Sequence, residues 1–243
     1  MSGSGYVRYE VVRNFRMAAF VVASLAFPLV IYFTVGVPNR HHTFDGIAFP
    51  LYFMTAMATL GTLVAVVSSG ARIAVERSLG WTRQMRTTPL TARVYFSAKV
   101  LSGYAMAILV IALLCLAGAT LGVRLPAGGW LTVVGLLLAG LVPFVVLGIL
   151  LGHLLTANSL GPAVGSVVTL LALVGGAYGF QLATSGPVFQ VIRALPSYWL
   201  VQAGKTALRG GGWPAVAWIV IAAWTAVLLP AAVLVFKRDT WRV

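Results

Sequence analysis

The sequence predicts an all-α integral membrane protein with six transmembrane helices. Apolar residues make up 60% of the 243 positions and charged residues only 9%. A soluble domain carries about 25% charged residues, because its surface faces water. Most of this exterior must therefore face lipid. Six apolar runs approach the roughly 20 residues that span a bilayer, so we expect a single transmembrane domain over 1–243, with spans near 18–37, 47–70, 99–122, 131–152, 162–182 and 215–236.

The distribution of basic residues predicts the orientation of these spans. Twelve of the 17 Lys and Arg fall before the first span, between spans two and three, or after the last span, and the other five lie in the connections on the opposite side. Short cytoplasmic connections of membrane proteins are enriched in Lys and Arg. Both termini are therefore expected to be cytoplasmic. The net charge of +13 serves orientation and contact with lipid headgroups, and no nucleic-acid partner is expected.

The segment 6–17 is expected to form an amphipathic helix in the cytoplasmic interface ahead of the first span. At helical spacing, an apolar stripe faces the membrane while the charged residues point away from it. The stripe consists of Val7, Val11 and Phe15, and the charged residues are Glu10, Arg13 and Arg16. A simple positively charged lead-in is an equally acceptable interpretation.

Spans five and six are joined by a second amphipathic segment, 187–212, on the outer side. Pro196 breaks it, Ser197 is expected to cap a new helix, and the run of glycines at 210–212 ends that helix. One face is then apolar and the other polar. The apolar face contains Leu200, Val201, Gly204, Ala207 and Leu208, and the polar face Gln202, Lys205 and Arg209. The segment is too apolar for an ordinary loop and is expected to sink partly into the outer leaflet.

The connection between spans two and three is arginine-rich and contains a glycine and a helix-stopping proline. From Ser78 to Arg86 it is expected to form a short helix along the cytoplasmic membrane surface. An ordinary positive loop that binds anionic lipid is the plainer interpretation. The notable residues are Glu76, Arg77, Gly80, Trp81, Arg83, Met85, Arg86, Pro89 and Leu90.

The order Glu76-Arg77-x-x-Gly80, then Met85, then Pro89-Leu90 resembles the loop after the second span in permeases of the type-2 ABC exporter class. Trp81 replaces the usual Thr of that family, and Arg83 stands where many members carry Glu. The similarity extends along the chain, since the lead-in helix, the six spans and the segment Leu195-Pro196-Ser197-Tyr198-Trp199 follow in the family's order.

The resemblance implies that loop 76–90 is a coupling helix that docks on a separate ATPase. It further implies two ATPase copies that bind ATP and Mg, a second permease copy in a homodimer, and location in a bacterial plasma membrane. Spans two and five would line the pathway of a hydrophobic drug, antibiotic or lipid. The outer segment, with Pro196, Tyr198 and Trp199, would act as an external gate.

No ATP site is expected in this chain. A phosphate-binding loop needs the pattern Gly-x-x-x-x-Gly-Lys-Thr. Gly204-Lys205-Thr206 matches its last three residues, but Trp199 stands in place of the first glycine. The chain is therefore expected to be a permease subunit with no catalytic residue or metal site of its own.

Two other function classes compete with this interpretation. An intramembrane enzyme would need a base beside Ser159 or Ser166, or converging metal ligands, and neither His153 nor the pair His41-His42 has such partners in the sequence. An ion-coupled secondary transporter or channel usually has ionisable residues inside its spans, and the sequence offers only Lys99, at a boundary. Uncharged polar residues are instead the expected pathway lining: Thr55, Thr59, Thr62, Thr169, Tyr178 and Gln181.

Overall fold

The structure is a computed structural model that describes residues 3–44, 46–80, 91–178 and 181–241. Within these residues it confirms an all-α fold with six helices long and apolar enough to cross a membrane. These are Ala18–Gly36, Phe49–Ser78, Arg93–Thr120, Ala127–Leu154, Ala157–Gly175 and Ala215–Arg238. The strands of the described chain are one antiparallel pair, β1 (Thr43–Phe44) and β2 (Ile47–Ala48).

The first span is preceded by α1 (Gly3–Phe15) and is itself built of α2 (Ala18–Val21), the π-helix η1 (Val22–Ala26) and α3 (Phe27–Gly36). Pro28 stands at the start of α3 and has no N–H to donate to the preceding turn. The π-helical turn η1 lies directly before it, and π-helix in proteins occurs mostly as single turns of this kind within α-helices. The hydroxyl of Ser24 donates to the carbonyl of Phe20 (2.6 Å) within this turn.

The second span is the central helix of the bundle. It consists of α4 (Phe49–Ala71), and α5 (Ile73–Ser78) continues it after one residue, so it runs past the predicted end at residue 70. In its most apolar window 89% of residues are buried, against 11% for the last span. A helix that is apolar on all sides belongs in a protein interior, and α4 packs against α3, α7, α9 and α10.

The next three spans pack around this helix. The third is α7 (Ala92–Thr120), and the fourth is divided at Leu141 into α8 (Ala127–Gly140) and α9 (Val142–Leu154), beside Pro143. The fifth, α10 (Ala157–Gly175), begins five residues before the predicted start at 162. Thr156 and Ser159 form a capping box there, which satisfies the free N–H groups of the first turn.

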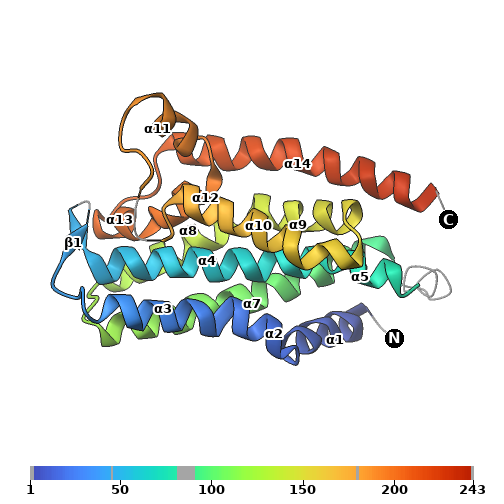
Figure 1. The fold of residues 1–243 in the computed structure, drawn as a ribbon, viewed down its shortest axis with the longest axis horizontal. Coiled ribbons are helices and arrows are strands. Elements are labelled where there is room, and N and C mark those ends of the chain that lie inside the picture. The colour runs from blue at the N-terminus through green and yellow to red at the C-terminus, as the bar shows by residue number, and fades with distance from the viewer. Residues whose placement is uncertain (1–2, 45, 81–90, 179–180, 242–243) are drawn as a thin grey trace.

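The outer segment contains three helices, α11 (Gly186–Arg193), α12 (Pro196–Val201) and α13 (Ala203–Leu208), followed by α14 (Ala215–Trp241). The prediction that Ser197 caps a helix was wrong: Leu195 is the cap residue, and Ser197 is fully buried. All six residues of α12 are buried, because α12 contacts α4, α8 and α10. The segment therefore folds back onto the bundle at α12, while α11 projects from it (Figure 1).

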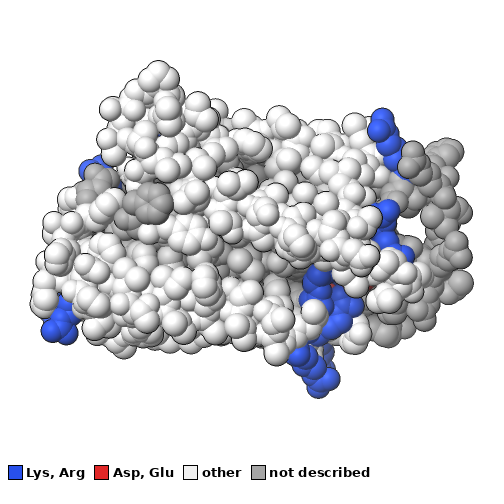
Figure 2. Space-filling view, in the orientation of Figure 1, with Lys and Arg blue, Asp and Glu red and all other residues white. Residues whose placement is uncertain are grey.

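The spans alternate in direction, so both termini lie at one end of the bundle (Figure 1). The strand β1 and helices α11 and α13 lie at the opposite end. We refer to these as the terminal end and the distal end. On the face shown in Figure 2, most of the long surface between the ends is uncharged, and Lys and Arg gather toward the two ends. This distribution fits a protein with an apolar girdle that faces lipid.

Helices α4 and α9 pack closely where they cross. A Cβ atom on Gly148 would lie 2.6 Å from the carbonyl oxygen of Val67, and one on Gly70 would lie 2.6 Å from the backbone nitrogen of Ile149. Small residues allow such backbone approach in membranes. Gly161 and Gly165 lie four residues apart on α10. A Cβ atom on either would meet no atom within 4 Å, because both glycines face outward.

We therefore expect Gly148→Ala to lower the thermal unfolding temperature of the purified chain in detergent, because the new methyl group meets backbone that cannot swing away. Overpacking of this kind costs about 1–3 kcal/mol. The matched control is Gly161→Ala, which adds the same methyl group in open space and should leave stability unchanged or slightly higher. Equal effects of the two substitutions would contradict the packing described here.

Candidate functional site

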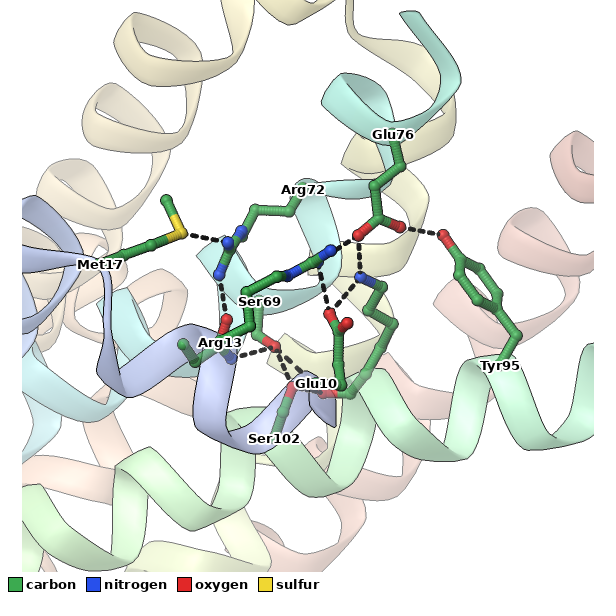
Figure 3. Close-up of polar contacts among 10 residues, drawn as sticks. Glu10, Arg13, Met17, Ser69, Arg72, Glu76, Tyr95 and Ser102 are labelled. Atoms are coloured by element: carbon green, nitrogen blue, oxygen red, sulfur yellow. Dashed lines mark hydrogen bonds and ion pairs between the residues drawn. The ribbon is translucent and has the colours of Figure 1, made fainter. Parts of the chain in front are cut away.

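A buried cluster of charged side chains joins three helices at the terminal end of the bundle. Its members come from α1, α5 and α7, which are separated in sequence but converge beside the end of the second span (Figure 3). We call Glu10, Arg13, Glu76, Tyr95 and Lys99 the ion cluster. Four ion pairs link its acidic and basic members.

Helix α1 packs against the bundle with the face that carries Glu10, which was predicted to point away from the membrane. Tyr6, Glu10 and Asn14 follow one another at helical spacing, and all three are buried. The prediction that Glu10 lies on the charged side of α1, away from the membrane-facing stripe, gave it a place in solvent, whereas Glu10 is 1% exposed. The reason is tertiary: α1 lies along α7, where Glu10 finds a buried cation.

Glu76 is the centre of the ion cluster. One of its carboxylate oxygens, Oε1, accepts hydrogen bonds from Lys99 Nζ at 2.5 Å and from Arg13, and Oε2 accepts from the Tyr95 hydroxyl at 2.6 Å. The Oε1 atom of Glu10 accepts from Lys99 and, at 2.7 Å, from Arg13. Each cation thus bridges both carboxylates (Figure 3).

The charges of the ion cluster balance, which explains how they can be buried. Lys99 and Glu10 are each 1% exposed and Glu76 is 5% exposed. An isolated buried charge is strongly unfavourable, whereas a pair with good hydrogen bonds regains much of the lost hydration. Two carboxylates and two cations meet this condition. For Arg13, burial alone would lower the pKa, but Glu76 and Glu10 outweigh it and raise the pKa, so the guanidinium stays charged.

A polar layer beside the ion cluster fixes the end of α1 to α4. Asn14 donates to the Ser69 hydroxyl at 3.3 Å, and Ser69 in turn shares a hydrogen bond of 2.9 Å with Ser102 on α7. Arg72, at the joint between α4 and α5, donates to Asn14 Oδ1 and to the sulfur of Met17. These contacts tie the terminal end of α4 to both neighbouring helices.

Arg77 ties α5 to the fourth span. Its guanidinium donates to the carbonyl oxygens of His153 (2.7 Å) and Gly152 (3.4 Å), at the end of α9. The His153 ring in turn packs against Phe96 of α7 and Phe236 of α14, at centroid distances of 6.2 and 5.6 Å. Thus α5, the segment that leads into the predicted coupling loop, is held by polar or aromatic contacts that reach α1, α7, α9 and α14.

The residues predicted for ATPase coupling fall into two groups. Glu76 and Arg77 are anchored as described, and Gly80 ends the helix with a φ of +71° in open space. The remaining ones lie outside the described residues: Trp81, Arg83, Met85, Arg86 and Pro89. For these five, coupling stays a prediction.

The predicted pathway residues are not brought together. The hydroxyls of Thr55, Thr59 and Thr62 are fully buried and donate to backbone carbonyls, Thr55 to Val201 of α12 among them (3.1 Å). They stabilise the interior instead of facing a free surface. Thr169 is exposed on α10, while Tyr178 and Gln181 are half-buried.

The predicted gate residues Pro196, Tyr198 and Trp199 belong to α12, the part of the outer segment that packs on the bundle, and all three are buried. The indole of Trp199 donates to the carbonyl of Arg193 (2.9 Å), which ties α12 to the end of α11. A gating role for them stays a prediction.

The sequence interpretation missed Glu10, Tyr95 and Lys99 as partners of Glu76. It placed Lys99 at a span boundary, but Lys99 lies within the third span and Glu76 within the second. One signal was available: the chain has only four acidic residues and three of them belong to the segments with most cations, so these acids were natural candidates for pairing. No group of three or more His, Cys, Asp and Glu side chains suited to a metal ion occurs among the described residues.

Comparison with known proteins supports the permease interpretation. No family model matches the chain. A curated protein of Bacillus subtilis (strain 168), named "Putative transport permease YvfS", is 28% identical over 206 residues, which cover 83% of each chain. This similarity agrees with the resemblance to a permease seen in the sequence, and six apolar helices fit such a permease.

Removing one charge from the ion cluster should destabilise the folded chain. We expect Lys99→Met to lower the stability of the purified chain by about 3–5 kcal/mol, because Glu10 and Glu76 then share one cation in a buried site. The double variant Glu10→Gln with Lys99→Met restores the charge balance and should recover part of the loss. The measurement is thermal unfolding in detergent.

The matched control for this series is Arg238→Met, which removes a cation from an exposed position at the same end of the bundle. A surface charge of this kind contributes little, about 0–1 kcal/mol. If Lys99→Met were no more harmful than Arg238→Met, the ion cluster would have no structural role.

Proposed function

We propose that this chain is the transmembrane subunit of an ATP-driven ABC exporter, moved by a separate ATPase through the loop that follows α5. The observation that carries the proposal is the placement of the ion cluster directly before that loop. Glu76 and Arg77 begin the family-like motif and are at the same time the residues that fasten α5 to its neighbours. A push on the loop would therefore reach α1, α7 and α9 together.

The proposed mechanism needs a rigid contact and a bundle with two arrangements, and no catalytic residue in this chain. ATP and Mg would be bound by two ATPase subunits. Their closure would displace α5 and, through the ion cluster, the terminal ends of α1 and α7. The Oε2 atom of Glu10 is buried and accepts no hydrogen bond within the described residues, so the ion cluster retains one acceptor for a second arrangement.

A second permease copy, in a homodimer, completes the proposal. Because α4 is enclosed within its own bundle, the surface of a pathway would come chiefly from outward-facing helices such as α10, which exposes Gly165, Ser166 and Thr169. Such a lining, small and without charge, suits a hydrophobic or amphipathic drug, antibiotic or lipid. The orientation that follows places both termini in the cytoplasm of a bacterial cell, as the basic residues predict.

An ion-coupled transporter is the second candidate, and one observation favours it: Lys99 and Glu76 are ionisable groups within spans. Both lie at one end of the bundle, however, and both are paired with α1. This arrangement supports a joint between helices better than a relay across the membrane. Transport driven by an ion gradient with no ATPase present would favour the second candidate and contradict the first.

The proposal predicts that Gly80→Ala uncouples ATP hydrolysis from transport in the complex of permease and ATPase. Alanine is strained at a φ of +71°, so the direction of the chain entering the loop should change. Substrate-stimulated hydrolysis in proteoliposomes should fall at least severalfold while the complex still assembles. The matched control is Gly122→Ala, since Gly122 also has a positive φ (+85°) and open space but lies between the third and fourth spans. Equal loss in both variants would contradict a coupling role for the loop.

A further inference from the structure

The cations at the terminal end exceed the carboxylates that can pair with them. Glu10 and Glu76 are both committed to Arg13 and Lys99. Arg72 has no carboxylate within ion-pair distance in the part of the chain that is described, and residues 81–90 contain no acidic residue. Arg16, which precedes Met17 in the sequence, is exposed. The region thus carries a local excess of positive charge at Arg72 and Arg16.

Arg72 is also poorly satisfied by its present partners. One terminal nitrogen donates to Asn14, but the other donates to the thioether sulfur of Met17, and the ring of Phe20 lies 6.0 Å from its guanidinium carbon. A thioether is a weak acceptor, whereas a guanidinium binds a phosphate through two parallel, charge-assisted hydrogen bonds. Met17 is 41% exposed and its side chain is flexible. An anion that displaced the sulfur would therefore gain a strong contact at small cost.

The position of Arg72 indicates where this anion would come from. Met17 immediately precedes the first span, and Arg72 lies near the terminal end of the second, so both stand at the depth of lipid headgroups. Lys and Arg gather over the part of the surface where Figure 1 places α1 and α2, as Figure 2 shows. Exposed apolar side chains continue from there along the first span: Val22, Phe27 and Val30. A phosphate beside arginines, above an apolar strip, matches the shape and charge of a phospholipid.

We propose that Arg72 and Arg16, with Met17 as a displaceable cover, form a binding site for the phosphate headgroup of an anionic phospholipid. The site is distinct from the transport pathway and does not depend on the proposed function. Its occupant would neutralise the excess charge next to the ion cluster and hold the joint between α1 and the first span against the membrane.

The test is native mass spectrometry of the full-length chain in detergent, titrated with phosphatidylglycerol and with phosphatidylcholine of the same acyl chains. The wild-type chain should retain the first phosphatidylglycerol more tightly than phosphatidylcholine. Arg72→Gln should weaken that binding about fivefold, as expected for one basic residue at a membrane surface, and leave phosphatidylcholine unchanged. Arg209→Gln, at an exposed arginine of the distal end, is the control and should bind as wild type does.

Three results would overturn the proposal. The first is equal binding of the two lipids, and the second is unchanged phosphatidylglycerol binding by Arg72→Gln. The third is full competition by soluble glycerol phosphate, which would indicate a site for free anions instead of lipid. If Arg72→Gln cannot be recovered in a folded state, Arg16→Gln is tested instead, because Arg16 is exposed and its substitution should not impair folding. Phosphatidylglycerol binding that is about twofold weaker supports the site, and unchanged binding overturns it.

Discussion

The pairing of the buried ammonium group of Lys99 is the constraint on which the terminal end of this bundle depends. With 1% of its surface exposed, Lys99 requires carboxylates beside it, and the chain has only four acidic residues to offer. Two of them reach Lys99 from different helices, Glu10 from α1 and Glu76 from α5. The ion cluster therefore fastens α1 to α5 and α7, so the lead-in helix packs against the bundle.

A second constraint organises the rest of the bundle. The central helix α4 has almost no lipid-facing surface, so its neighbours must approach it closely on every side. Gly148 and Gly152 permit this on α9, where backbone meets backbone. Threonines along α4 return their hydroxyls to carbonyl groups, which leaves few polar atoms unsatisfied inside the bundle. Glycines on the outward side of α10 have no comparable partner within the described chain. A pair of glycines four residues apart therefore marks a close helix contact on α9 but not on α10.

Much of this fold could be predicted from the sequence, because hydropathy and span length depend on the bilayer and not on tertiary detail. All six spans were found, as were the lead-in helix and the break near Pro196 that separates α11 from α12. The ion cluster could not be found in that way. Helical periodicity places Glu10 on a polar face, but only the docking of α1 on α7 reveals that this face is buried. Similarly, Ser197 has the chemistry of a cap, yet packing beside Gly175 buries it.

The same placement explains why α5 suits the transmission of a movement. A helix held only by apolar contacts can slide gradually, since hydrophobic contacts have little directional preference. Short charge-assisted hydrogen bonds are directional, so Glu76 and Arg77 can shift only if α1, α7 and the end of α9 shift with them or the bonds exchange partners. A displacement of α5 would therefore shift the terminal end from one discrete arrangement of hydrogen bonds to another. That property is what a permease without its own energy source would require of the segment that a partner pushes.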